Sequence, residues 1–169
     1  GGGANFGWVQ CSPSWAIEAS GTPYARGGVT YDAGKVLDGQ TDTYWNPQGT
    51  AKNFNRWYII FNFGQSYTLW RFRFSHWGDT THDIKTFKLQ WSASASPYDW
   101  KDALTVDGAV GGTNKFQYFS GFGASGQYWR FLITGTQSGW QPYLKEVGFY
   151  GMVAGKDSIF VGYKDVRLG

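Results

Sequence analysis

A carboxylate, a glycine and a hydroxyl are closely spaced in the segment from Lys35 to Trp45. Asp38 and Gly39 occupy a predicted tight turn, and Thr43 follows it. The oxygens of Asp38 and Thr43 can point into such a turn together with nearby backbone carbonyls, which is how proteins hold a hard cation such as calcium. The same residues also suit an Asx turn without a metal. They therefore predict either a calcium site or a self-contained turn.

Glu146 is a second carboxylate in an unusual setting, because it lies between Leu144 and Val147 on a predicted core strand. A lone carboxylate is costly to bury unless a partner compensates its charge. A cation shared with the turn of Asp38 would be such a partner. A salt bridge to a lysine or arginine is the alternative.

The segment from His76 to Asp83 concentrates donors and acceptors beside Trp77, and it contains both histidines of the chain. A sugar needs polar partners for its hydroxyls and an aromatic ring against its apolar face, so this composition suits a carbohydrate site. Alternatively, the polar side chains only cap and brace a long turn. A catalytic dyad or a metal site is disfavoured, since neither a serine in a strained elbow nor a third ligand accompanies the histidine and aspartate.

Composition restricts the class of protein further. The 169 residues suit one domain, and 20% aromatic residues with 25 glycines favour strands and tight turns. The formal charge of +3 comes from scattered cations without a basic run, which argues against nucleic acid. Cys11 is the only cysteine, so an internal disulfide, a zinc cluster and a redox pair are excluded. No apolar stretch approaches the roughly 18 residues that span a bilayer, so we expect a soluble chain with a mature or trimmed start.

Runs typical of β-strands recur at short intervals, bounded by turn residues. The predicted strands are Trp57 to Phe63, Thr68 to Ser75, Thr86 to Ser92, Lys115 to Phe119, Tyr128 to Thr134 and Leu144 to Tyr150, with a further candidate at Ser158 to Tyr163. In the second run, Trp70, Phe72 and Phe74 are expected on the core face, and Leu69, Arg71, Arg73 and Ser75 on the other. Such strands with short connections predict a sandwich or a barrel.

Four fragments in this order resemble the discoidin-like, or coagulation factor 5/8 type C, family, which includes lectin-like carbohydrate-binding modules. They are Asp38-Gly39 with Thr43 and Trp45, then Trp57 to Gly64, then Tyr128 to Phe131, and finally Glu146 to Gly151. The resemblance implies an all-β, galactose-binding-domain-like jelly-roll β-sandwich of about eight main strands, with binding loops at one end. We therefore expect a discoidin-like domain over residues 1–152 and a C-terminal extension over 153–169 that adds one or two strands.

The resemblance also implies metal ligands and sugar contacts. Calcium would be held by Asp38, Thr43 and Glu146, and by the backbone carbonyls of Lys35, Gln40 and Lys145. Carbohydrate contacts would come from His76, Trp77, Asp79, His82 and Asp83, and from Trp45, Arg56 and Trp140 on neighbouring loops. An arginine that sugar-binding relatives commonly carry is replaced here by Asp83, so the sugar stays unassigned.

Together these expectations describe a secreted, non-catalytic, calcium-stabilised lectin-like module that binds a glycan or glycoconjugate in recognition or adhesion. The alternative is a phospholipid-binding module, in which Tyr24, Arg26 and Tyr31 form a tip that enters an anionic membrane surface. A small jelly-roll glycoside hydrolase would need two facing carboxylates; the chain has only two glutamates, Glu18 and Glu146, and pairs that include an aspartate are possible but lack any motif. Vertebrate members close the domain with a disulfide that this chain lacks, which moves the resemblance toward the lectin-like members.

Overall fold

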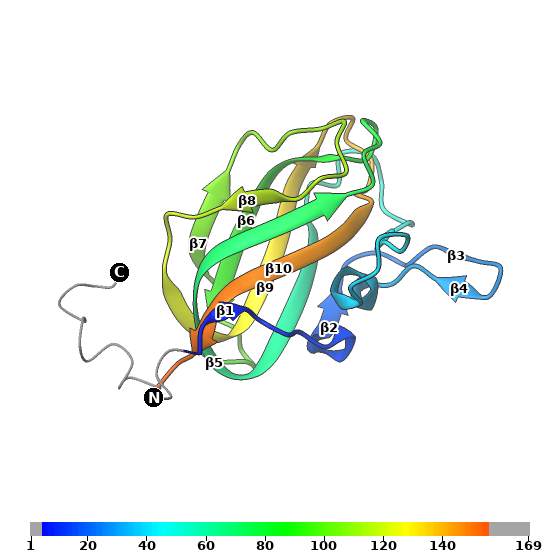
Figure 1. Ribbon diagram of the computed structural model, residues 1–169. Helices are drawn as coiled ribbons and strands as arrows, with labels where there is room; N and C mark the ends of the chain where they lie inside the picture. The colour runs from blue at the N-terminus through cyan, green and yellow to red at the C-terminus, as the bar shows by residue number, and fades with distance from the viewer. Residues whose placement is uncertain (1–4, 156–169) are drawn as a thin grey trace.

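The computed structural model describes residues 5–155, which form an antiparallel β-sandwich (Figure 1). The longer strands are β5 (Trp57–His76), β6 (Ile84–Ser92), β7 (Lys101–Val106), β9 (Ala124–Thr136) and β10 (Leu144–Val153). The shorter strands are β1 (Gly7–Trp8), β2 (Ala16–Ala19), β3 (Ala25–Arg26), β4 (Val29–Thr30) and β8 (Gln117–Phe119). Two short 3-10 helices, η1 (Pro13–Trp15) and η2 (Ala33–Leu37), lie among the first strands.

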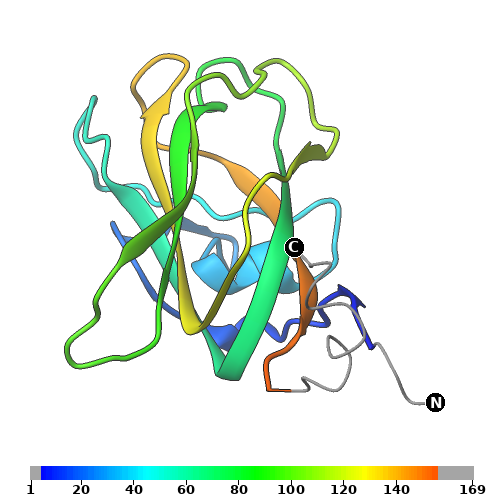
Figure 2. The same ribbon diagram turned by 90° about the vertical axis from the view of Figure 1, so that its left-hand side faces the viewer.

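Strand β5 belongs to both layers of the sandwich. Its first half pairs with β2 and β9, and its second half pairs with β10 and β8 and, over Tyr67 to Leu69, with the start of β9. The strand bends at residues 63–66, where its register with β9 shifts and Gly64 adopts a φ of +80° that glycine tolerates without a Cβ clash. One layer thus contains β2, the first half of β5, β9, β6 and β7. The other contains β1, β10, the second half of β5 and β8 (Figure 2).

The core between the two layers is aromatic. Phe72 of β5 is fully buried, and its ring centroid lies 5.1 Å from that of Phe131 and 5.3 Å from that of Phe149. Phe87 of β6 meets Phe131 edge-on at 5.1 Å. Tilted aromatic pairs of this kind contribute about 0.5–1.5 kcal/mol beyond the area they bury. The core therefore holds the layers rigidly, so that loops at their ends have fixed positions.

The structure confirms the predicted all-β sandwich, with two corrections to its strands. The predicted strands Trp57 to Phe63 and Thr68 to Ser75 are two halves of β5, because the chain turns a corner between them without leaving the sheet. The second correction concerns the predicted faces of Leu69 and Trp70. The register of β5 with β10 shifts opposite Tyr150 and Gly151, which reverses the inward and outward alternation of side chains there. Leu69 is therefore buried, and Trp70 packs against Tyr150 outside the core.

Part of the chain's C-terminal region is not described. The candidate strand Ser158 to Tyr163, and the predicted extension beyond residue 155, lie outside the described residues. Within residues 5–155 there is no helix long and apolar enough to cross a membrane.

Four connections gather at one end of the sandwich, namely residues 38–56, 77–83, 107–116 and 137–143. His76 ends β5 opposite Leu144, the first residue of β10, so the loops that adjoin these two residues lie side by side. Trp57 begins β5 opposite Ile133, close to the end of β9. The β3–β4 hairpin projects from the body of the molecule (Figure 1). We call the end of the sandwich where the four connections gather the loop end.

Candidate functional site

Backbone hydrogen bonds join the connections at the loop end to one another. The Trp77 amide donates to the Tyr143 carbonyl at 3.0 Å, and the Tyr143 amide donates to the His82 carbonyl at 3.3 Å. On the hairpin side, the Asn46 amide donates to the Tyr31 carbonyl at 3.0 Å. Segments that are distant in the sequence are therefore held in fixed register, and their aromatic side chains meet.

These side chains form a connected cluster, which we call the aromatic platform. It consists of Tyr24, Tyr31, Tyr44, Trp77, His82 and Tyr143. Tyr44 is central, with its ring centroid 4.8 Å from Tyr31, 4.9 Å from Trp77 and 5.2 Å from Tyr143. His82 stacks on Tyr143 at 3.7 Å with the two ring planes 6° apart. Because the Trp77 side chain is 44% exposed, the platform presents an indole to solvent.

Polar groups surround this platform. His82 Nδ1 donates to the Gln141 carbonyl at 2.6 Å, which leaves Nε2 free to accept when the ring is neutral. Burial, followed by the neighbouring Asp79 carboxylate, raises the pKa of Tyr143, so its hydroxyl stays protonated and can donate. The Lys145 ammonium lies 5.6 Å from the centre of the Trp77 ring. Donors and acceptors thus border an exposed aromatic surface.

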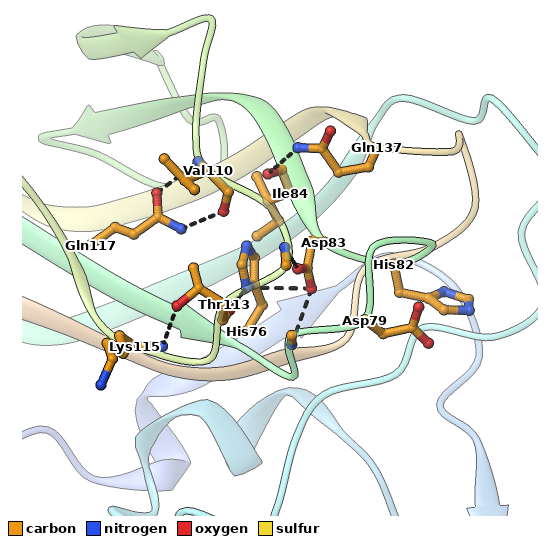
Figure 3. A network of polar contacts seen from close by, with 12 residues as sticks. His76, Asp79, His82, Asp83, Ile84, Val110, Thr113, Lys115, Gln117 and Gln137 are labelled. Carbon is orange, nitrogen blue, oxygen red and sulfur yellow. Dashed lines mark hydrogen bonds and ion pairs between the residues drawn. The ribbon is translucent and has the colours of Figure 1, made fainter.

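A separate polar network lies beneath the loops (Figure 3). The Asp83 carboxylate is fully buried and accepts the amides of Gly112 at 2.6 Å and Gly78 at 3.2 Å. His76 Nδ1 lies 2.8 Å from the Thr113 carbonyl and 3.4 Å from Asp83 Oδ1. Burial lowers the pKa of His76, so the ring is neutral and donates from Nδ1. The pair holds the connection 77–83 against the connection 107–116.

This network corrects the prediction that His76 and Asp83 contact a sugar. Both side chains are fully buried, so neither can reach a ligand at the surface. Trp45 is corrected for the same reason, since it is 1% exposed and packs in the hydrophobic core. Figure 3 shows that Asp79 and His82 point away from the buried pair.

The remaining predicted contacts divide into two groups. Trp77, His82 and Asp79 lie on the aromatic platform or at its edge. Arg56 and Trp140 are exposed on neighbouring connections, where the Arg56 guanidinium packs 4.2 Å from the Phe54 ring centre. No aromatic contact within residues 5–155 joins Trp140 to the platform.

The turn predicted to bind calcium lies beside the same end of the sandwich. Asp38 Oδ1 accepts the Gln40 amide at 2.9 Å, which is the expected Asx turn, and Oδ2 accepts the Thr43 hydroxyl at 2.6 Å. Glu146 reaches this turn from β10, and its Oε2 accepts the Gly39 amide at 3.2 Å. We call residues 35–43 with Glu146 the cation turn.

The donor atoms of the cation turn suit a hard cation. Burial, and then the adjacent Asp38 carboxyl, raises the pKa of Glu146 to about 8. Within the described residues no lysine or arginine forms an ion pair with either carboxylate, so the alternative of a salt bridge is absent there. Across residues 5–155 histidines, cysteines and acidic residues do not cluster in groups of three or more. Calcium would therefore need backbone carbonyls to complete its oxygen ligands, and Lys35, Gln40 and Lys145 are the predicted sources.

The pattern of these residues can be compared with known families. The F5/8 type C domain family matches residues 16–146. The chain belongs to this family. No curated protein sequence matches it significantly.

Solved structures share the fold of this F5/8 type C domain. The CBM32-3 module of a family 31 glycoside hydrolase from Clostridium perfringens has a TM-score of 0.70 at 17% identity, covering 85% of this chain and 94% of that chain. Chitosan-binding module 1 of a chitosanase/glucanase from Paenibacillus sp. IK-5 has a TM-score of 0.63 at 20% identity, covering 83% and 99%. The CBM32 of AlyQ, in complex with 4,5-unsaturated mannuronic acid, has a TM-score of 0.59 at 19% identity, covering 79% and 94%.

Sequence reasoning missed Tyr44, the central residue of the platform in this F5/8 type C domain. Tyr44 precedes Trp45 in the family-like segment, and the two side chains point in opposite ways, since Trp45 enters the core while Tyr44 contacts Tyr143. Residues that alternate in this way on an extended segment face opposite sides. This alternation was the available signal for placing Tyr44 outside the core.

Proposed function

We propose that this F5/8 type C domain is a non-catalytic module that binds a glycan at the aromatic platform and acts outside the cell, in recognition or adhesion. The observation that supports this most directly is the exposed Trp77, held by Tyr44 at 4.9 Å within a larger set of rings. A rigid, exposed ring offers the apolar face of a pyranose a surface without a large loss of side-chain entropy.

The edge of the platform supplies the polar part of sugar recognition. His82 Nε2 and the Asp79 carboxylate are acceptors for sugar hydroxyls, and the protonated Tyr143 hydroxyl is a donor. The solved relatives include modules named for chitosan binding and for a complex with a mannuronic acid derivative. Those names support carbohydrate as the ligand class, and the residues of the platform support its location.

A non-catalytic role agrees with the carboxylates near the platform. Glycoside hydrolysis uses two carboxyl groups on opposite sides of the scissile bond. Of the acidic residues on the connection 77–83, Asp79 borders the platform, while Asp83 is fully buried and accepts two backbone amides. Asp79 alone suits hydrogen bonding to a sugar better than acid and base catalysis.

Calcium at the cation turn is part of the proposal. Asp38, Thr43 and Glu146 would contribute side-chain oxygens, and the bound ion would offset the charge of the two adjacent carboxylates. Lys145 lies next to Glu146, and its ammonium is 5.6 Å from the centre of the Trp77 ring. The cation turn would therefore keep the start of β10 in place beneath one edge of the platform.

A glycan array probed with calcium and again after calcium removal tests this proposal. We expect the native domain to bind a restricted set of glycans, and Trp77→Ala to lose that binding while its near-UV circular dichroism shows a folded domain. Ile17→Ala is the matched control, because it removes a 48% exposed apolar side chain from β2, outside the platform. Equal binding by the Trp77 variant would place the ligand elsewhere. Binding to anionic vesicles without any glycan binding would favour the phospholipid alternative.

A further inference from the structure

A second aromatic surface lies on the outer face of the layer formed by β1, β10, β5 and β8. Six rings that are not part of the hydrophobic core follow one another across these strands, each 5.1 to 6.3 Å from the next. They are Trp70, Phe6, Tyr150, Trp8, Tyr118 and Phe116, and we call them the aromatic strip. Tyr118 is 50% exposed and Phe6 is 47% exposed, so the strip is open to solvent. The aromatic platform shares no residue with it.

Two arginines of β5 lie against the aromatic strip. The Arg73 guanidinium bridges two rings, 4.1 Å from the centre of Trp8 and 4.2 Å from the centre of Phe116. The Arg71 guanidinium lies 5.1 Å from Tyr118 and 5.6 Å from Trp8. Aromatic contact stabilises the flat faces of a guanidinium, but it leaves the N–H groups at the edge without acceptors.

Between residues 5 and 155 these N–H groups have no carboxylate partner. Among the described residues, neither Arg71 nor Arg73 forms an ion pair, and Arg73 Nε is buried without a hydrogen-bond partner. The positive charge of Arg73 acts to lower the pKa of Glu146, but the Glu146 carboxylate accepts its hydrogen bond from the Gly39 amide. Buried donors without partners are uncommon in folded proteins and call for an explanation.

The backbone is shaped to hold Arg73 in this position. Gly148 of β10 pairs directly with Arg73 of β5, and a Cβ atom at Gly148 would lie 2.7 Å from Arg73 Nε. The missing side chain at Gly148 gives the arginine room to lie across β10 and reach Trp8. The orientation of the guanidinium is therefore a property of the strand pair.

A groove continues from the aromatic strip toward the cation turn. It has a volume of about 440 Å³, and Phe116 and Tyr118 of the strip line it together with Lys145 and Glu146. Lys115 also borders it. With Arg71 and Arg73, these lysines make the surface rich in cations, with Glu146 as the acidic group on the groove.

We infer that the aromatic strip is a second binding surface, selective for an acidic polysaccharide of the uronic acid class. Each repeat of such a polymer has an apolar ring face, which suits Trp8 and Tyr118, and a carboxylate, which a planar guanidinium binds with two parallel hydrogen bonds. Four of the rings, Trp8, Trp70, Tyr118 and Tyr150, lie on strands and not on projecting loop tips, and this favours an extended chain over insertion into a membrane. The inference does not rest on glycan binding at the aromatic platform, because the two surfaces use different residues.

The test uses polygalacturonate as the probe, in calcium-free buffer at physiological ionic strength, with affinity electrophoresis and titration calorimetry. We expect Arg71→Gln with Arg73→Gln to weaken binding roughly tenfold or more, because charge-assisted hydrogen bonds are lost. Arg73→Lys should weaken it also, since an ammonium keeps the charge but not the planar fork. Arg26→Gln with Lys85→Gln is the control, which removes the same charge from exposed positions outside the strip.

Several outcomes would overturn the inference. The first is equal weakening by the control variant, and the second is full binding by the double arginine variant with an unchanged circular dichroism spectrum. Binding of polyglutamate as tight as that of polygalacturonate would show a surface selective for charge only, and tighter binding to phosphatidylserine vesicles would identify a lipid surface. Trp77→Ala should leave polygalacturonate binding by the strip unchanged, so failure of the platform and failure of the strip are distinguishable.

Discussion

Replacing Glu146 with glutamine should have opposite effects on stability in the absence and the presence of calcium. In the calcium-free protein, burial and the adjacent Asp38 raise the pKa of Glu146 from 4.5 to about 8. The folded state then binds a proton more tightly than the unfolded state does. The contribution of Glu146 to stability is therefore full below pH 4.5 and is lost as the pH rises toward 8. A neutral glutamine removes this dependence on pH.

The size of the effect follows from the pKa. Each pKa unit corresponds to about 1.4 kcal/mol of differential interaction between the two protonation states. Glu146 is only half-buried, so water screens much of this energy, and about 1–2 kcal/mol of stability should be lost between pH 5 and pH 8. For a domain of this length, the loss lowers Tm by roughly 3–6 °C. Glu146→Gln should abolish most of this decrease.

Scanning calorimetry at pH 5 and pH 8 measures the effect, with protein passed over a chelating resin and then with calcium added. Calcium should raise Tm of the native domain, since a ligand that binds only the folded state stabilises it by mass action. It should have little effect on Glu146→Gln. Asp107→Asn, which changes an exposed carboxylate outside the cation turn, is the control. A calcium-dependent increase that is equal in both proteins would refute the assignment of Glu146, and a native Tm that is the same at both pH values without calcium would refute the role of its pKa.

Three further substitutions have defined outcomes. Trp77→Ala should lower the free energy of unfolding in urea by less than about 1 kcal/mol, because the side chain is partly exposed. Its glycan affinity should fall about tenfold or more. A large loss of stability would contradict a ligand role. Asp83→Ala should lower the free energy of unfolding by about 3–5 kcal/mol, because buried donors lose their acceptor, and a loss below about 1 kcal/mol would contradict the network. Gly139→Ala should lower Tm, since Gly139 has a φ of +93° and an added Cβ would collide with Asn53 Oδ1; an unchanged Tm in a thermal scan would refute this strain.

The strands of the fold could be predicted, but not all of their connections. Alternation placed Phe72 and Phe74 in the core because the side-chain period of a strand is set by its local geometry. The bend at residues 63–66 carries the same turn residues as a hairpin would. Only the pairing with β9 on both sides of the bend shows that β5 continues. Such pairing is a long-range property, and local sequence does not contain it.

The candidate site was predicted in part for a similar reason. The segment His76 to Asp83 was correctly identified as rich in polar groups, but its residues face both inward and outward. His76 continues the inward positions of Phe72 and Phe74, so the strand period extended by two residues would have placed it in the core. Tyr24, Tyr44 and Tyr143 are brought together by hydrogen bonds between loops. No local sequence pattern predicts that these three side chains lie in one cluster.

The passage of β5 through both layers has a consequence for how the domain unfolds. Because the 20 residues of this strand pair with β2 and β9 at one end and with β10 and β8 at the other, neither layer can open without exposing an edge of the other. The two layers should therefore melt as one cooperative unit. Most of these partners are far from β5 in the sequence, so the chain loses loop-closure entropy before the stabilising contacts form. Folding is therefore expected to be slow. Because β5 turns the corner at Gly64 and continues into the second layer, the aromatic platform and the aromatic strip should be lost together when the domain unfolds.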